Sequence, residues 1–199
     1  GAGTDTITIE GVDELTPMDY QVMPDRIEAG TFLVAAAMTG GRVGVKGGCA
    51  IHMEALLSKL EEAGATVAAT PETLWVEGPE EIRSVNIKTQ PHPGFPTDMQ
   101  AQFTSLFAIT PGISVVEDTI FPQRFMHCAE MSRMGADIKV DNGTAIIQGS
   151  DNMSGAPVMA SDLRASAALV LSGLRSEGTT EINRLYHIDR GYENIDDKL

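Results

Sequence analysis

Three stretches of the chain share one pattern of polar and apolar positions. Each opens with a small or rigid residue and an aspartate, at Asp25, Asp98 and Asp162, and continues into a long apolar run. An aspartate before an apolar run is typical of a helix N-cap, and a glycine after the run is typical of a helix end. The three aspartates recur about 70 residues apart, which indicates an internal repeat.

A second helix and two short strands follow the first helix in two of the repeats. Residues 52–70 predict a helix that ends in a Gly-Ala step and runs into a strand, and residues 73–78 predict the next strand. Residues 126–149 repeat this order, with alternation at 138–140 and a turn at Asp141-Asn142-Gly143 that favours a hairpin. One unit is therefore predicted to contain helix, strand, helix, strand and strand.

The two ends of the chain lie within units of this kind. The third unit stops at Leu199, inside its predicted second helix, and residues 1–12 resemble the closing part of another unit. We therefore expect residues 1–15 to be the closing strands of a preceding domain. Residues 16–199 are expected to form a domain of three repeats, the last of them truncated. The chain is predicted to be part of a longer protein.

Charge and cysteine usage exclude several classes of protein. The 199 residues carry a net charge of -14, which argues against nucleic-acid binding, and no apolar run reaches the roughly 18 to 20 residues of a membrane helix. A few placed arginines would still suffice for an anionic small molecule. Cys49 and Cys128 are far apart, and His127 and His187 lack metal-ligand spacing. We expect packing roles for these four residues, no metal, and a reducing compartment such as the cytoplasm.

A proline-rich loop leads directly into the second of the three aspartates. Residues 89–96 contain three prolines and are followed by Thr97-Asp98. A rigid loop before a helix can present groups to a ligand, but the same loop can be a simple turn between repeats. The sequence leaves both interpretations open.

Five collinear strings carry a family resemblance. Residues 20–37, 93–103, 119–127, 160–171 and 184–199 resemble the UDP-N-acetylglucosamine enolpyruvyl transferases, and differ from the sister enzymes that make enolpyruvylshikimate phosphate. The resemblance implies an α/β fold, an inside-out α/β barrel of repeated strand-helix units. It also implies transfer of the enolpyruvyl group of phosphoenolpyruvate to the sugar 3-hydroxyl of UDP-N-acetylglucosamine, with release of phosphate. That reaction is the first committed step of bacterial peptidoglycan synthesis.

The resemblance also implies that part of the active site lies elsewhere. The family's reactive cysteine sits on a loop of an N-terminal domain, with a lysine and arginines that hold phosphoenolpyruvate, and no string of this chain matches it. This chain alone is therefore expected to be inactive, and to need that domain as a partner. No cofactor is implied.

Three residues are assigned catalytic roles by the resemblance. Asp98 would contact the sugar 3-hydroxyl as the general base, and Asp162 would handle a proton at the enolpyruvyl methylene. A helix N-cap would explain either aspartate as well. Arg190 would engage the phosphate or carboxylate of phosphoenolpyruvate. Its alternative is a surface ion pair with Asp189 or Glu193.

The substrate-binding set is completed by residues in the same motifs. Ile120 and Phe121 would lie at the UDP-sugar site, the former through its backbone, although an apolar pair after a strand is ordinarily core. Thr97 belongs to the motif of Asp98. Arg124 and Arg164 would form a cationic wall, or else salt bridges between repeats.

Three hypotheses follow from these predictions. The chain is part of a transferase that is active only with the missing domain, a UDP-sugar-binding domain without turnover, or a fragment that assembles with itself through its incomplete repeats. The first two differ in whether the missing half belongs to the native protein, and the third predicts an assembly through residues 1–15 or the last helix. The first measurement is phosphate release by the chain with both substrates supplied: no release alone, and turnover once the missing domain is added, would support the first hypothesis.

Overall fold

The structure, a computed structural model, describes residues 1, 3–4 and 6–199. Three short 3-10 turns accompany its helices and strands. The helices are α1 (Arg26–Thr39), α2 (Glu54–Glu62), α3 (Gln100–Ala108), α4 (Met126–Arg133), α5 (Leu163–Leu174) and α6 (Ile195–Lys198). The strands are β1 (Arg42–Lys46), β2 (Thr66–Ala69), β3 (Thr73–Glu77), β4 (Ile87–Lys88), β5 (Gly112–Glu117), β6 (Asp137–Asp141), β7 (Thr144–Gly149), β8 (Pro157–Met159) and β9 (Glu181–Asn183).

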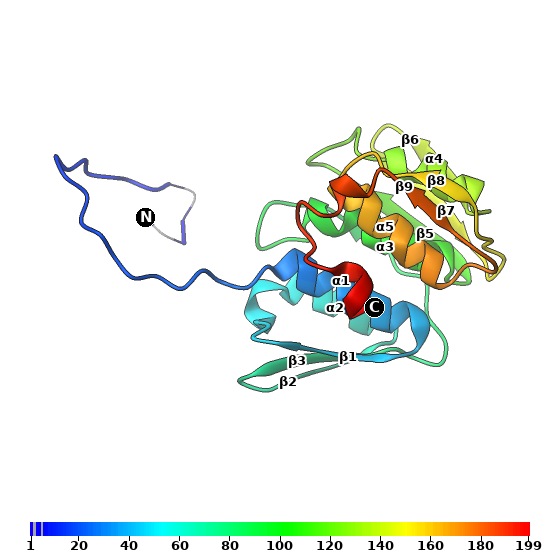
Figure 1. The fold of residues 1–199 in the computed structure, drawn as a ribbon, viewed down its shortest axis with the longest axis horizontal. Helices are drawn as coiled ribbons and strands as arrows, with labels where there is room; N and C mark the ends of the chain where they lie inside the picture. The colour runs from blue at the N-terminus through cyan, green and yellow to red at the C-terminus, as the bar shows by residue number, and fades with distance from the viewer. Residues whose placement is uncertain (2, 5) are drawn as a thin grey trace.

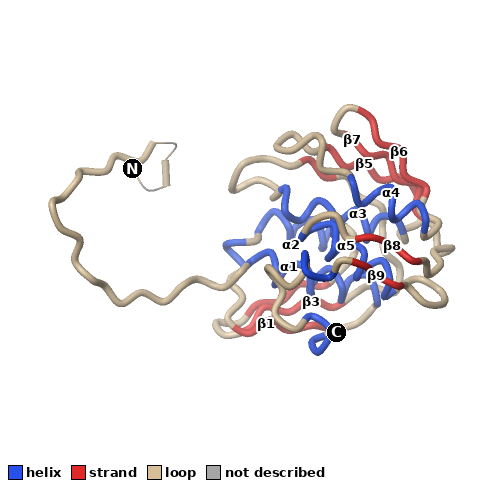
Figure 2. The backbone as a smooth tube through the Cα atoms, turned by 45° about the horizontal axis from the view of Figure 1, so that its top comes forward, coloured by secondary structure: helices blue, strands red, loops and turns tan. Residues whose placement is uncertain are grey.

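The first helices of the three units pack together at the centre. Every residue of α3 is buried, and most residues of α1 and α5 are buried as well. A helix that is buried all round is covered on every side, and the other elements provide this cover. Figures 1 and 2 show the sheets at the outside and these helices between them. The predicted inside-out α/β arrangement is confirmed.

The first unit follows the predicted order. Asp25 caps α1 by accepting hydrogen bonds from the amides of Ile27 at 2.8 Å and Glu28 at 3.2 Å. The helix ends at Gly40, whose φ of 68° is the left-handed conformation that glycine adopts without strain. The strands form an antiparallel sheet in the order β1-β3-β2.

The second unit contains the predicted hairpin and one strand more. Strands β6 and β7 pair antiparallel around Asn142 and Gly143, whose φ angles of 45° and 78° fit a type I′ turn. The sheet order is β4-β5-β7-β6, with β4 parallel to β5. Strand β4 has only two residues, so no alternation in the sequence predicts it.

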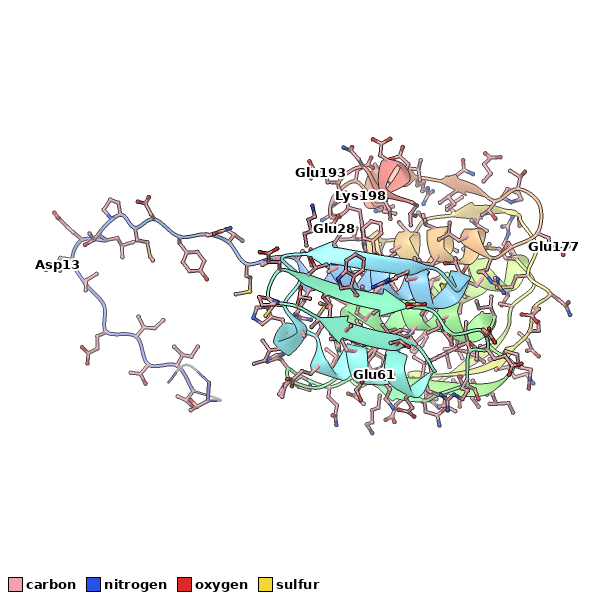
Figure 3. The ribbon with its side chains drawn as sticks, turned by 90° about the horizontal axis from the view of Figure 1, so that it is seen from below. Asp13, Glu28, Glu61, Glu177, Glu193 and Lys198 are labelled. Carbon is pink, nitrogen blue, oxygen red and sulfur yellow. The ribbon has the colours of Figure 1, made fainter. Side chains whose placement is uncertain are left out.

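The third unit stops after a short second helix. Strand β8 pairs parallel with β9, and the chain then returns along the central helices to α6. Lys198 of α6 forms an ion pair with Glu28 of α1 at 2.8 Å, and Figure 3 labels both residues on the same side of the body. That the third repeat is truncated stays a prediction.

Two predicted helix ends are wrong. Helix α3 ends at Ala108 and α5 at Leu174, and the residues that follow them, Ile109 and Arg175, are not in the left-handed conformation. The glycines expected to end them, Gly112 and Gly178, lie beyond the helix ends, and Gly173 lies inside α5. The chain turns without a glycine cap at these two ends, so the apolar runs overestimate the lengths of these helices.

The N-terminal segment lies outside the packed body. Residues 6–24 form neither helix nor strand, and Figure 1 shows the segment running away from the central helices. The closing strands predicted for residues 1–15 are therefore not formed here, and the domain boundary at residue 15 stays a prediction. Within that range, residues 2 and 5 lie outside the described residues. No described helix is both long and apolar enough to cross a bilayer.

Candidate functional site

Asp98 does not cap the helix that follows it. It lies in the 3-10 turn Thr97–Met99, and α3 begins without a side-chain cap. Its carboxylate instead accepts hydrogen bonds from Arg124 at 2.7 Å and from Arg164 at 3.4 Å. The N-cap alternative is wrong for this residue, and its charge is directed toward other side chains.

Two opposing effects set the pKa of Asp98. Burial raises the pKa, because a charged carboxylate is less stable away from water. The hydrogen bond from Arg124 and the charges of Arg164 and Arg124 act against burial, and the net result is a pKa below the ordinary 3.8. Asp98 is therefore ionised at neutral pH.

The two arginines come from different units. Arg124 follows β5, and its guanidinium lies 5.6 Å from the centre of the Phe121 ring. Arg164 lies in the first turn of α5, with a side chain only 12% exposed. The salt-bridge alternative is thus observed, and the Asp98–Arg164 bridge joins the second and third units. One buried nitrogen of Arg164, Nη1, has no hydrogen-bond partner in the described part of the chain.

Asp162 is a helix cap. Its carboxylate accepts hydrogen bonds from the amides of Arg164 at 2.8 Å and Ala165 at 2.9 Å. Since the Arg164 side chain also reaches Asp98, the two aspartates are linked through one residue. The capping alternative is realised at Asp162, and the cap fixes the start of the helix that carries Arg164.

The first turn of α4 carries a buried histidine and a buried cysteine. Burial lowers the pKa of His127 from 6.5 to about 4; the Asp162 charge opposes this and the Arg124 charge adds to it. Burial raises the pKa of Cys128 to about 12, so its thiol stays protonated and unreactive. Both residues have the expected packing role, whereas Cys49 is only half-buried. No group of three metal-ligating side chains occurs among the described residues.

A cavity of about 270 Å³ opens beside Asp98. It is bordered by the proline-rich loop, the start of α1, the segment before α2 and Ile120. The loop therefore lines a cavity, which favours the ligand-presenting interpretation over a simple turn. Its lining residues include Arg26, His52, Glu54, Gln90, Pro91, His92, Pro93, Gly94, Thr97, Asp98 and Ile120.

The apolar pair after β5 is not core. Ile120 is half-buried and borders the cavity, and Phe121 is 55% exposed. The core alternative is wrong for both residues. An exposed phenylalanine stacked against Arg124 leaves an apolar surface beside the site.

Arg190 lies on a segment that is anchored near the helix starts. The adjacent Gly191 packs so closely on Leu163 that a Cβ there would lie 2.8 Å from its Cδ2, and the Tyr192 hydroxyl is 2.8 Å from the hydroxyl of Thr31. Arg190 itself is exposed, and the described residues offer it no ion pair, so the pairing with Asp189 or Glu193 is not observed. The structure brings Asp98, Arg124 and Arg164 together, but not Arg190.

Sequence reasoning missed Asp118. This residue is 2% exposed and follows β5 directly, and its carboxylate accepts hydrogen bonds from Thr97 and from the Ile120 and Phe121 amides. An aspartate next to the end of an alternating strand was the only signal, and such residues are usually solvated. The side-chain hydroxyl of Thr97 is therefore directed into the protein.

The whole chain, residues 1–199, matches the family described as EPSP synthase (3-phosphoshikimate 1-carboxyvinyltransferase). The chain belongs to this family. Within it, the chain is 62% identical to UDP-N-acetylglucosamine 1-carboxyvinyltransferase of Akkermansia muciniphila, over all of this chain and 47% of that protein. It is 55% identical to the enzyme of the same name from Geotalea daltonii, over all of this chain and 48% of that protein. The predicted resemblance is confirmed, and the chain spans about half the length of the curated relatives it matches.

Two solved structures share the fold. The enolpyruvyl transferase NikO of Streptomyces tendae superposes with a TM-score of 0.80 at 23% identity, over 89% of this chain and 42% of that one. EPSP synthase of Acinetobacter baumannii gives a TM-score of 0.65 at 16% identity, over 87% of this chain and 44% of that one. At these identities the likeness establishes the fold alone.

Proposed function

We propose that this chain supplies one half of the active site of a UDP-N-acetylglucosamine 1-carboxyvinyltransferase. The whole enzyme would move the enolpyruvyl group of phosphoenolpyruvate to the sugar 3-hydroxyl and release phosphate. Residues 16–199 would form one domain, and residues 1–15 would close the other. The high identity to relatives of that name supports the choice over the shikimate enzymes.

One observation carries the proposal: Asp98 borders a cavity, paired with two arginines instead of capping its helix. An ionised carboxylate beside a cavity can accept the proton of a sugar hydroxyl as the new C–O bond forms. As the hydroxyl proton goes to Asp98, the sugar oxygen would bond to C2 of phosphoenolpyruvate and C3 would take up a proton. C3 would then lose a proton, the double bond would form again, and the phosphate would leave with the electrons of its C–O bond. Asp98 is the proposed general base.

The arginines would have two states. In this structure Arg124 and Arg164 neutralise Asp98 and hold its pKa below 3.8. An anionic substrate that attracts the same guanidiniums would weaken these hydrogen bonds, and the pKa of Asp98 would rise. The base would thus become stronger when the anion is bound. The unpartnered Nη1 of Arg164 supports this, since it leaves a donor available.

The other predicted residues would act alongside Asp98, and of these Thr97 and Ile120 line the same cavity. Asp162 would assist proton transfer at the methylene while capping α5, and exposed Arg190 would engage phosphoenolpyruvate from its anchored segment. The Ile120 backbone and Phe121 would contact the UDP-sugar. The product would serve peptidoglycan synthesis, and hence cell shape and division, in the cytoplasm.

Phosphate release tests the proposal. The chain would be assayed with both substrates, alone and fused to the N-terminal part of the Akkermansia muciniphila relative; the natural full-length protein would serve equally. We expect release from the fused protein only. No release from the fused protein would overturn the function. Enzymic release by the chain alone would overturn the half-site and require a catalytic group among residues assigned to packing.

A second candidate is a UDP-sugar-binding domain without turnover. The cavity beside Asp98 favours it, because a space of about 270 Å³ is bordered by the proline-rich loop, the start of α1 and Ile120 without the N-terminal domain being present. Calorimetric titration of the chain with UDP-N-acetylglucosamine, in parallel with the fused protein, separates the two. Binding by both proteins with turnover by neither would select this candidate.

The proposed role of Arg190 makes a separate prediction. Arg190→Lys keeps the charge but loses the planar fork that binds a carboxylate or phosphate with two hydrogen bonds. In the fused protein we expect the KM for phosphoenolpyruvate to rise about 10-fold or more, since one charged hydrogen bond contributes about 1.5–3 kcal/mol. Steady-state kinetics with each substrate varied in turn gives both KM values. An effect confined to the UDP-sugar would contradict the assignment.

A further inference from the structure

The carboxylate of Asp118 joins three segments that border the candidate site. Its Oδ1 accepts hydrogen bonds from the Thr89 hydroxyl at 2.8 Å and from the amides of Ile120 at 3.0 Å and Phe121 at 2.9 Å. Its Oδ2 accepts one from the Thr97 hydroxyl at 2.7 Å. These donors lie at the start of the proline-rich loop, at its end, and in the loop after β5.

Both members of the Asp98–Arg124 ion pair depend on these hydrogen bonds. Thr97 directly precedes Asp98, so its bond to Asp118 restrains the turn that carries the base. The Phe121 carbonyl accepts from the Arg124 amide at 2.9 Å, while the Phe121 amide donates to Asp118. One carboxylate therefore restrains the backbone on each side of the pair.

Asp118 is a buried charge without a cation. It is 2% exposed, and no described lysine, arginine or histidine forms a salt bridge with it. Such a charge is costly unless hydrogen bonds replace its water, and four neutral donors do so here. Because two donors are backbone amides, the loop must keep one conformation for the carboxylate to stay satisfied.

The outer sheet supports the same residue from behind. The Asp118 amide donates to the Gly143 carbonyl at 2.8 Å, at the tip of the β6–β7 hairpin. Thr89, in turn, accepts from the Thr119 amide at 3.0 Å, and its carbonyl accepts from the Thr119 hydroxyl at 2.6 Å. The main chain of Asp118 is thus held at the hairpin tip, and the Thr89 hydroxyl that donates to Asp118 is held by the Thr119 amide, a bond that does not need the Thr119 side chain.

We infer that Asp118 is a positioning residue, which sets the geometry of Asp98 and Arg124 and of the Ile120–Phe121 backbone at the sugar side of the cavity. It touches no substrate. This inference rests on the proposed function for its catalytic consequence, but its structural consequence can be measured independently.

Asp118→Asn in the fused protein is the direct test. An asparagine retains one acceptor, but its NH₂ group replaces an oxygen and cannot accept from Thr97 while the other contacts remain. A displacement of about 1 Å at the base can cost about 10²-fold in rate, so we expect kcat/KM to fall by that amount. The acidic limb of the pH profile should also move to higher pH, because Asp98 loses part of its contact with Arg124.

Two further variants separate positioning from general destabilisation. Thr97→Val deletes a single donor to Asp118 and should displace Asp98 less than Asp118→Asn does. We therefore expect kcat/KM to fall by about 10-fold, and the acidic limb of the pH profile to move in the same direction. Thr119→Val is the matched control in the same loop, since its hydroxyl binds the Thr89 carbonyl and not Asp118. It should leave kcat/KM within about twofold, as most surface substitutions do. If Asp118→Asn fails to fold, the comparison of Thr97→Val with Thr119→Val decides.

The outcomes keep the two proposals apart. Turnover by the wild-type fusion with unchanged kinetics in Asp118→Asn and Thr97→Val would overturn the inference and leave the function standing. No turnover by the wild-type fusion would overturn the proposed function. Crystal structures of the wild type and of Asp118→Asn would then decide whether Asp118 positions the Asp98–Arg124 pair. An Asp98–Arg124 separation beyond about 4 Å in the variant would support the inference, and an unchanged pair would overturn it.

Discussion

The starts of α3 and α5 occupy equivalent places in two repeats, and their aspartates do different things. At α5, Asp162 accepts from two amides of its own helix. At α3, the helix begins two residues after Asp98, and the carboxylate pairs with Arg124 and Arg164 beside a cavity. The same residue type at the same repeat position thus completes a helix in one unit and is available for chemistry in another.

The difference originates in the segments that precede the helices. Before α5, strand β8 leads to Asp162 through two residues. Before α3, the proline-rich loop intervenes, and the hydrogen bond from Thr97 to Asp118 draws the chain toward the end of β5. The 3-10 turn follows, and the Asp98 side chain is directed away from the helix amides.

The largest expected effect is at Asp98. Asp98→Asn removes the base but keeps a hydrogen-bond acceptor for the arginines, so turnover of the fused protein should fall by about 10² to 10⁴-fold. Phosphate release under single-turnover conditions measures this loss. Asp25→Asn is the matched control, because Asp25 holds the equivalent position in the first repeat as the exposed cap of α1, and its own side chain is not among those that line the cavity. Equal losses in the two variants would remove Asp98 from the mechanism.

The next effect concerns the pH dependence of stability. The pKa of His127 is about 4 in the folded chain and 6.5 ordinarily, so the unfolded state binds more protons between these values. Stability should therefore decrease as the pH falls from 6.5 to 4, by an amount on the order of 3 kcal/mol. Urea unfolding at several pH values measures the slope.

His127→Gln sharpens that measurement. The variant lacks the titrating ring, and its stability curve should be flatter than that of the wild type over the same pH window. The charges of Asp162 and Arg124 both act on the pKa of His127. The difference between the two stability curves therefore measures the combined effect of burial and of these two charges on that pKa. Parallel curves would show that another group dominates the acid response.

A smaller effect is expected at the two caps. Asp162→Ala and Asp25→Ala should each lower the free energy of unfolding by about 0.5–2 kcal/mol, the usual loss for a removed N-cap. Only the first should also slow turnover. Asp162→Ser retains the cap without the charge, so chemical denaturation and kinetics on this variant separate the two roles. Full recovery of turnover with serine would make Asp162 a cap and nothing more.

The smallest effect is the contribution of Asp98 to stability. Its pKa in the folded chain lies below 3.8, so its contribution is present above pH 3.8 and is lost as the pH falls through the lowered pKa. The side chain is 40% exposed, and solvent screening keeps the contribution small. The stabilities of Asp98→Asn and wild type should therefore differ slightly above pH 3.8, and acid unfolding should show this difference vanishing at the lowest pH values. A large difference at neutral pH would contradict this.

The sequence predicted the repeat and most of its elements because these depend on local patterns. The aspartates, the apolar runs and the Asn-Gly turn carry their structure within a few residues. Strands β4 and β8 were missed, since two or three residues have no period and depend on the sheet beside them. The helix ends of α3 and α5 were also misplaced for lack of a local stop signal.

The candidate site was predictable in its residues but not in its contacts. Family strings gave Asp98, Arg124 and Arg164, whereas only the fold shows that they form one ion-pair cluster across two units. Asp118 could not be identified, because its role arises from donors 21 and 29 residues away in the chain. The cap at Asp162 was one of two open alternatives, and the helix geometry decided it.

The hairpin between β6 and β7 has a consequence for which insertions the chain can accept. Loop tips are usually the places where extra residues are tolerated. Here a Cβ added to Gly143 would lie 2.9 Å from the Cβ of Pro122. The Gly143 carbonyl also accepts a hydrogen bond from the Asp118 amide. A longer turn at this tip would move the Gly143 carbonyl that binds the Asp118 amide. The hydrogen bonds that Asp118 accepts from Thr97 and Ile120, which line the cavity, would move with it. The length of this surface turn is therefore fixed by the site behind it.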